Sequence, residues 1–466
     1  MLFTEPLFFA FMAVVWPVYW LLRTNRARKI WLLLASYVFY GAWDWRFLFL
    51  ILGSTAVDYV VALQIQESES SRRKRWLLVS LFANLGLLGF FKYFNFFIES
   101  GNSLLSLFGD FEMRTFGILL PIGISFYTFQ TMGYSIDVYR RRMEPCRDFW
   151  DFAVYVGFFP QLVMGPILRA IDFLPQLETR KSFWNTPFRA SITLFVLGFI
   201  KKACISDNIA PLVDSIYADV GSFDALSLVL AAFLYAVQIY CDFSGYADMA
   251  IGIAGLLGYQ VPINFDFPFF ASNISDYWRR WHISFSSWVR DYLYFPLGGS
   301  RGSEAQTDRN LMITMLLSGL WHGAGAHFIV WGGLNGIALV FHRLYSRVRG
   351  VPQLLRSLFA HTGVALTFYW FVLSTIFFRA QSLPDALQVV RAMLLFDSPG
   401  ETSITPWTLA WFVPLTMAHW IAYKTNLPRL SEKLHPLLFA AALGILIPIA
   451  LTFVRLEYRA FTYFQF

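Results

Sequence analysis

The sequence predicts an all-α polytopic integral membrane protein. Of its 466 residues, 57% are hydrophobic, 19% are aromatic and only 14% are charged, a composition far from that of soluble domains. Apolar segments recur along the whole chain, and about 20 apolar residues suffice for an α-helix to cross a bilayer. Basic residues gather in the short loops between these segments, which is the pattern that orients membrane proteins.

That charge distribution argues against nucleic acid as a partner and favours a lipid bilayer. The formal net charge is +7, but no basic stripe forms on one continuous segment. The three cysteines, Cys146, Cys204 and Cys241, show neither a pairing pattern nor metal-ligand spacing.

The first half of the chain predicts five spans. Residues 2–22 are apolar and precede the basic run RTNRARK, whereas a secretory signal carries its positive charge first. This segment is therefore expected to be a retained first span. The next spans are expected at residues 30–41, 47–64, 76–98 and 115–138, with a polar loop around Asn102 and Asp110 before the last.

Basic patches set the orientation of these spans. They occupy residues 23–29, 72–75 and 140–142, and an even number of crossings separates each patch from the next. All three patches are therefore expected in the cytoplasm and the N-terminus outside it.

The middle of the chain is less regular. Residues 149–164 are apolar, but basic stretches flank both ends, so a re-entrant segment is expected there. Non-helical backbone at that depth requires surrounding protein or a cavity. Residues 188–200 and 225–258 are expected to continue the membrane core.

The last part predicts three spans near residues 359–378, 407–423 and 437–453, which gives eleven to thirteen membrane segments in total. Without a long linker or repeat, residues 1–466 are expected to form a single domain. Its parts would be N-terminal spans at 1–114, a catalytic core at about 115–345 and C-terminal spans at 346–466.

His322 is the main candidate for chemistry. It lies thirteen residues after Arg309 (322 minus 309), which places it roughly 20 Å along a helix from that charge. An ionisable group at such depth is a functional candidate by default. Small residues follow it, Gly323, Ala324, Gly325 and Ala326, and are expected to admit a substrate or backbone. The alternative is a histidine that hydrogen-bonds a neighbouring helix.

His282 is the second candidate. Within residues 278–292, aromatic side chains recur at spacings of three and four, which predicts one helix with an aromatic stripe. His282 belongs to a polar stripe beside it, with Arg279, Ser286 and Arg290. The alternative is an interfacial anchor without chemistry.

Other polar groups are expected to be structural. Asp242 and Asp248 are candidates for proton-relay carboxylates, or for partners of Ser244, Tyr246 or arginine side chains that hold the bundle together. Gly298, Gly299 and Gly302 with Arg301 are weak evidence for a phosphate site. His327 lies five residues after His322, which does not fit two metal ligands on one helical turn. The histidines expected to be structural are His342, His361, His419 and His435.

Several blocks of the sequence resemble the membrane-bound O-acyltransferases, and more narrowly the bacterial alginate O-acetyltransferase branch, with relatives that act on cellulose, other exopolysaccharides and peptidoglycan. The blocks are LPIGISFYTFQ (120–130), IDVYR (136–140), FPQLVMGPILR (159–169), YCDFSGYADMAIG (240–252), NFDFPFFASNISDYWRRWHISFSSWVRDYLYFPLGGSRG (264–302), GLWHG (319–323) and FFRA (377–380).

The resemblance implies a bundle of about eleven transmembrane helices with re-entrant helices around a central tunnel, in the bacterial inner membrane. It maps the family's invariant histidine to His322 and a second site histidine to His282. Family members often carry WGxxHG after the catalytic block, whereas this chain has WGGLNG, with Asn335 in place of histidine.

The implied chemistry moves acetyl from acetyl-CoA or another acyl thioester to a sugar hydroxyl, with no metal and no permanently bound cofactor. His322, kept neutral by desolvation, would take the hydroxyl proton. His282 or a backbone N–H near Gly323 would support the oxyanion. Implied partners are the polysaccharide acceptor, most of all alginate, and periplasmic polysaccharide-acetylation proteins.

Two other classes of function compete with this enzyme. A transporter would use Asp242 and His322 to relay protons, but it is expected to show inverted repeats, which the sequence lacks. A structural subunit of an export complex would make both histidines dispensable.

The topology is testable by labelling single cysteines introduced at Arg73 and Asn102 in a cysteine-free background. Because residues 72–75 are expected to face the cytoplasm and 101–112 the outside, a membrane-impermeant reagent should reach only Asn102→Cys in intact cells. Equal labelling of both from one side would contradict the topology.

Overall fold

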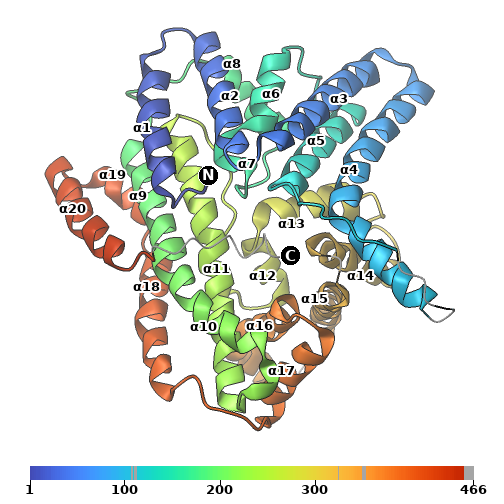
Figure 1. Ribbon diagram of the computed structural model, residues 1–466, viewed down its shortest axis with the longest axis vertical. Helices are drawn as coiled ribbons and strands as arrows, with labels where there is room; N and C mark the ends of the chain where they lie inside the picture. Colours follow the sequence, from blue (N-terminus) through green and yellow to red (C-terminus); the bar gives the residue numbers. More distant parts are fainter. Residues whose placement is uncertain (107–108, 110–112, 324, 349–352, 456–466) are drawn as a thin grey trace. The chain divides into compact units, whose positions relative to one another are not determined.

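The computed structural model describes residues 1–106, 109, 113–323, 325–348 and 353–455, and this part of the chain is helical (Figure 1). Only an isolated bridge, Phe223 to Glu401, pairs extended backbone there. The chain forms two compact units. Unit 1 comprises Met1–Phe188 with Ile253–Pro262, and unit 2 comprises Arg189–Gly252 with Ile263–Phe466.

Unit 1 contains eight helices in its described part. They are α1 (Pro6–Leu21), α2 (Asn25–Gly41), α3 (Leu48–Glu67, after the short η1, Trp45–Phe47), α4 (Ser70–Leu105), α5 (Ile124–Tyr139), α6 (Phe149–Gly157), α7 (Phe159–Leu162) and α8 (Ala170–Glu178).

The remaining helices lie mostly in unit 2, and only the last residues of α11 belong to unit 1. These helices begin with α9 (Phe188–Phe199). They are the π-helical η2 (Ile200–Ser206), α10 (Asp207–Ala218), η3 (Val220–Ser222), α11 (Ala225–Leu256), η4 (Pro268–Phe270), α12 (Ile274–Arg280), α13 (Ile283–Val289), the π-helical η5 (Arg290–Tyr294), α14 (Glu304–His322), α15 (Ala326–Tyr345), α16 (Gln353–Arg379), α17 (Leu383–Leu395), η6 (Pro406–Trp411), α18 (Phe412–Lys424), α19 (Leu427–Lys433) and α20 (Pro436–Thr452).

The all-helical polytopic membrane class is confirmed. Among the described residues, five helical stretches are long and apolar enough to cross a bilayer: Trp45–Glu67, Ser70–Asn102, Ala225–Leu256, Ala326–Tyr345 and His361–Arg379. The apolar helices α1 and α20 are shorter. Other expected segments form short or less apolar helices. The expected division of residues 1–466 into N-terminal spans, a catalytic core and C-terminal spans stays a prediction.

The expected span at 115–138 is wrong in its first third, because α5 begins only at Ile124. Pro121 and Gly123 precede the helix, and Gly123 has a left-handed backbone (φ 77°). A Cβ atom on Gly123 would lie 2.3 Å from the Leu162 carbonyl oxygen, so only glycine fits this approach.

The expected polar loop is also displaced. Asn102 belongs to α4, where its side-chain amide bonds the backbone N–H and C=O of Met113, both at 2.8 Å. Asp110 lies outside the described residues. Residues 149–164 form the short helices α6 and α7, and nine residues of α6 span only about 14 Å.

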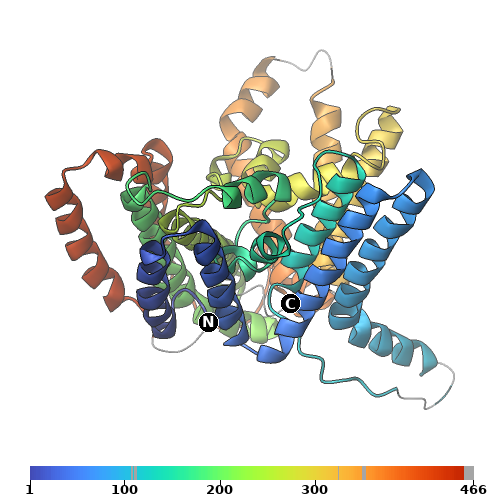
Figure 2. The ribbon, with the colours of Figure 1, turned by 90° about the horizontal axis from the view of Figure 1, so that it is seen from above.

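A buried carboxylate joins three helices of unit 1. Asp58 on α3 accepts hydrogen bonds from Ser80 (2.5 Å) and Asn84 (2.7 Å) on α4 and from Ser135 (2.8 Å) on α5. These helices lie side by side in Figures 1 and 2. Hydroxyl and amide donors thus satisfy the Asp58 carboxylate, as a buried carboxylate requires.

Basic residues at the expected cytoplasmic patches also bond backbone carbonyls. Arg28 donates to the carbonyl oxygens of Trp20 (3.2 Å) and Leu22 (3.0 Å) at the end of α1, which lack partners within the helix. Arg73 donates to the Tyr139 carbonyl (2.9 Å) and is buried, so exposed Arg72 is the better position for cysteine labelling.

In unit 2, α14 and α15 form a tightly packed helical hairpin. A Cβ atom on Gly319 would lie 2.2 Å from the Phe328 carbonyl oxygen, and one on Gly332 would lie 2.4 Å from that of Met315. Small residues are what allow helix backbones to approach this closely.

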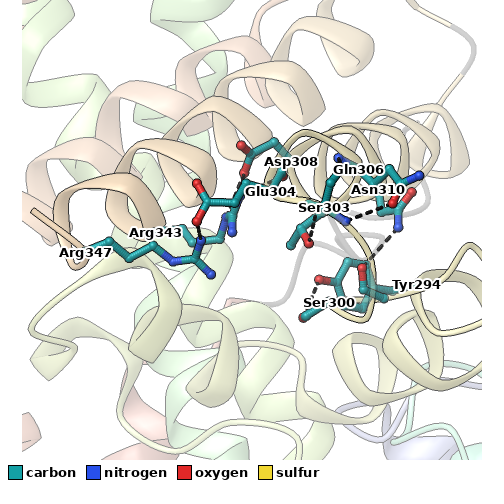
Figure 3. Close-up of polar contacts among 11 residues, drawn as sticks. Tyr294, Ser300, Ser303, Glu304, Gln306, Asp308, Asn310, Arg343 and Arg347 are labelled. Atoms are coloured by element: carbon teal, nitrogen blue, oxygen red, sulfur yellow. Dashed lines mark hydrogen bonds and ion pairs between the residues drawn. The ribbon is translucent and has the colours of Figure 1, made fainter.

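Ion pairs join the same two helices at the other end of the hairpin, as Figure 3 shows. Arg343 on α15 bonds Asp308 on α14 at 2.7 Å, and Arg347 pairs with Glu304. The hairpin is therefore held by charges at one end and by glycine contacts nearer the other.

Adjacent glycines on α15 provide a matched test of this packing. Gly332→Ala should lower the apparent melting temperature in detergent, because the added methyl group has no space and overpacking costs about 1–3 kcal/mol. Gly333→Ala should leave the melting temperature unchanged or raise it, since its Cβ atom would meet only a Leu316 methyl group at 3.6 Å. Tryptophan fluorescence on heating measures both, and equal melting temperatures would contradict the glycine contact.

Candidate active site

His322 is the last residue of α14 and is surrounded by aromatic rings. Its imidazole lies edge-on to Trp331 of α15 and Phe378 of α16, each with ring centroids 5.0 Å apart. Phe285 of α13 approaches it at 5.9 Å. The side chain is 5% exposed. Because α14 runs without interruption from Arg309 to His322, the estimate of roughly 20 Å between them holds.

The glycines after His322 make room for the chain's own rings, and whether they also admit a substrate or backbone stays a prediction. A Cβ atom on Gly323 would lie 2.1 Å from the ring of Phe328, and one on Gly325 would lie 2.3 Å from the ring of His327. Ala324 lies outside the described residues. The glycines therefore serve aromatic packing beside His322.

The single helix expected over residues 278–292 is wrong. The chain forms α12, breaks at Trp281 and His282, and continues as α13 and the π-helical η5. His282 has φ 43° and ψ 54°, a left-handed conformation that a non-glycine residue rarely adopts. The aromatic residues therefore do not form one stripe. Tyr277 and Trp281 join the apolar core of unit 2.

His282 is buried in this break. Its Nδ1 lies 3.2 Å from Oδ1 of Asn264, and the rings of Phe243 and Phe285 approach at 4.6 and 5.0 Å. His282 lies outside the five candidate spans, and burial lowers its pKa to about 3. Its imidazole is therefore neutral at neutral pH.

The structure brings both predicted histidines to one phenylalanine ring. The ring centroid of Phe285 lies 5.0 Å from that of His282 and 5.9 Å from that of His322, and Phe285 stacks on Trp321 at 4.4 Å. The sequence did not identify Asn264 as part of this site. Asn264 lies 18 residues before His282, and the only sequence feature that pointed to it was its place in the NFDFP block.

The two aspartates of α11 contact lysines of a neighbouring helix. Asp242 lies 2.8 Å from Lys202, which also contacts Asp207 at 2.7 Å. Asp248 bonds Lys201 at 2.6 Å. Both lysines belong to the π-helical η2, so these contacts hold η2 against α11.

The glycine-rich turn does not form an open phosphate site. At the start of α14, Ser303 Oγ accepts the Gln306 N–H, and Gln306 Oε1 accepts the Ser303 N–H (Figure 3). Side chains of the protein therefore already cap the helix terminus that would bind an anion. Asn335 donates a hydrogen bond to the Trp331 carbonyl at 2.9 Å.

Comparisons with known proteins identify the family of this chain. Residues 146–380 match the membrane-bound O-acyltransferase family. The chain is 41% identical to the probable alginate O-acetylase AlgI of Pseudomonas aeruginosa over 403 residues, which cover 85% of this chain and 76% of that protein. It is 38% identical to the peptidoglycan O-acetyltransferase of Helicobacter pylori over 431 residues, covering 84% of this chain and 80% of that protein.

A more distant relative is the teichoic acid D-alanyltransferase of Streptococcus thermophilus, with 28% identity over 250 residues, 50% of this chain and 59% of that protein. The matched region contains α12 to α15 and both buried histidines. With most of the chain aligned at about 40% identity, the chain belongs to the membrane-bound O-acyltransferase family.

Proposed function

We propose that this enzyme takes acetyl groups from a cytoplasmic thioester and moves them across the membrane for O-acetylation of an extracytoplasmic polysaccharide, most of all alginate. One observation carries this proposal. In a polytopic O-acetyltransferase, the buried imidazoles of His282 and His322 both lie near the ring of Phe285. The 41% identity to a probable alginate O-acetylase favours alginate over cellulose, other exopolysaccharides or peptidoglycan.

In the proposed reaction, His322 accepts the proton of a sugar hydroxyl while the hydroxyl oxygen attacks the thioester carbonyl carbon. The resulting tetrahedral oxyanion collapses, the carbon–sulfur bond breaks, and the thiolate leaves with the proton that His322 holds. Aromatic rings pack around His322 and leave it only 5% exposed to water. Either His282 or a backbone N–H near Gly323 supports the oxyanion.

The proposed setting is the bacterial inner membrane, with the N-terminus in the periplasm. Acetyl-CoA or another acyl thioester is the donor substrate, and no cofactor stays bound. Periplasmic polysaccharide-acetylation proteins are the proposed partners, and they receive acetyl groups or deliver the acceptor. The even number of crossings between basic patches supports this orientation.

A transporter function would assign Asp242 to a proton relay with His322. The contacts of Asp242 speak against that role, because Lys202 lies 2.8 Å away and itself contacts Asp207. An ion pair with a buried lysine instead gives Asp242 a structural role between η2 and α11.

His322→Ala should lower polymer O-acetyl content by about a hundredfold or more, the scale expected for losing a general base. Polymer secretion should continue, since the reaction and not export depends on this imidazole. Both quantities are measured in the same cells, with protein abundance checked by immunoblot. His327→Ala is the matched control and should leave acetyl content unchanged. Normal acetyl content in the His322→Ala strain would end the proposal.

Asp242→Asn should keep acetyl content within several-fold of the unsubstituted protein, because the amide still accepts a hydrogen bond from Lys202. Its thermal stability should fall, since removing one charge of a buried pair is destabilising. The same acetyl assay and a melting curve in detergent measure both effects. Loss of acetylation with normal abundance and unchanged melting would instead assign Asp242 to the chemistry.

A further inference from the structure

Asn264 holds three consecutive residues at the break between α12 and α13. Its backbone carbonyl accepts the Ile283 N–H at 2.9 Å. Its side-chain Oδ1 accepts the Ser284 N–H at 3.1 Å and the Ser284 hydroxyl at 2.9 Å, and lies 3.2 Å from Nδ1 of His282. Asn264 is 1% exposed, so its carbonyl and side-chain bonds form away from solvent.

These contacts fix which end of the Asn264 amide faces His282. The Ser284 N–H can only donate, so the amide atom that meets it must be the oxygen. The same oxygen faces Nδ1 of His282 and accepts but cannot donate. Nδ1 must therefore carry the hydrogen.

The state of the other ring nitrogen then follows. A neutral imidazole carries one hydrogen, so with Nδ1 protonated, Nε2 presents a lone pair. His282 is 1% exposed and packs between Phe243 and Phe285, and such burial disfavours the doubly protonated ring. Nε2 can accept a hydrogen bond, but it has no hydrogen to donate to an oxyanion.

We propose that Asn264 is a positioning residue for acetyl transfer, which holds His282 at the break between α12 and α13 and locks it in the Nδ1–H tautomer. This inference rests on the proposed function. Support of the oxyanion then falls to the backbone N–H near Gly323 and not to His282. His322 keeps its role as the base.

Asn264 also stabilises the fold, so activity alone does not test its positioning role. The N–H groups of Ile283 and Ser284 lie in the first turn of α13. His282 is the N-cap residue of this helix, and its side chain makes no capping hydrogen bond. Asn264 supplies both acceptors. A substitution that merely loosens α13 would lower activity as well, so the decisive readout is the tautomer itself.

The test is nitrogen NMR of the full-length protein in lipid, labelled with ¹⁵N in its histidine rings. The His282→Gln variant lacks the His282 signals and so assigns them. In the unsubstituted protein, we expect a protonated Nδ1 and an unprotonated Nε2. The opposite pattern, with hydrogen on Nε2, overturns the inference.

Two substitutions of Asn264 extend the test. Asn264→Leu removes the acceptor, so the Nε2–H tautomer should appear and acetyl content should fall about ten- to a hundredfold, as for other partners that orient a functional histidine. Asn264→Asp keeps an acceptor oxygen, so Nδ1 should stay protonated and acetyl content should remain within several-fold. Its negative charge should also make Nε2 titrate at a higher pH than in the unsubstituted protein.

The outcomes separate the two proposals. If His322→Ala retains normal acetylation, the proposed function fails, whatever the tautomer of His282. If His322→Ala abolishes acetylation but Asn264→Leu leaves the His282 tautomer unchanged, only the role of Asn264 fails. Loss of acetylation in Asn264→Asp with Nδ1 still protonated would likewise overturn it.

Discussion

The backbone contact between α14 and α15 is the constraint on which the site geometry depends. Gly319 and Gly332 let the two helices meet at van der Waals distance, and Trp331, next to Gly332, thereby reaches the imidazole of His322. At the other end, Arg343 and Asp308 hold the same pair of helices together. A larger side chain at either glycine would separate the helices and remove one wall of the aromatic surroundings of His322.

Buried charge in this chain is satisfied in three different ways. Lys202 is balanced by carboxylates, Arg28 by backbone carbonyls at a helix end, and Asp58 by hydroxyl and amide donors. Each solution answers the same requirement, because a charge without partners is costly away from water. Burial of an ionisable residue in this chain is therefore not by itself a sign of catalysis, because hydrogen bonds and ion pairs already account for these groups.

The sequence predicted the fold class well because long apolar segments and their basic flanks are local signals. Family motifs, and for His322 the helical distance from Arg309, also indicated the two histidines that lie beside Phe285, and their catalytic roles stay predictions. It could not predict the break at His282, because the stabilising partner, Asn264, is remote in the chain and acts through tertiary hydrogen bonds. The spacing of aromatic residues there favoured one helix, and tertiary contacts outweighed that preference.

The shortness of α20 has a consequence for the surrounding lipid. Its 17 residues are almost all apolar and largely exposed, yet they rise only about 26 Å, less than the roughly 30 Å of a bilayer's hydrocarbon core. Such hydrophobic mismatch is relieved when acyl chains compress beside a helix or when charged residues at its ends extend to the headgroups. Lys433 precedes α20 and Arg455 follows it, so both ends have a side chain able to reach the headgroups. Lipids with shorter acyl chains should therefore match α20 better than lipids with longer ones.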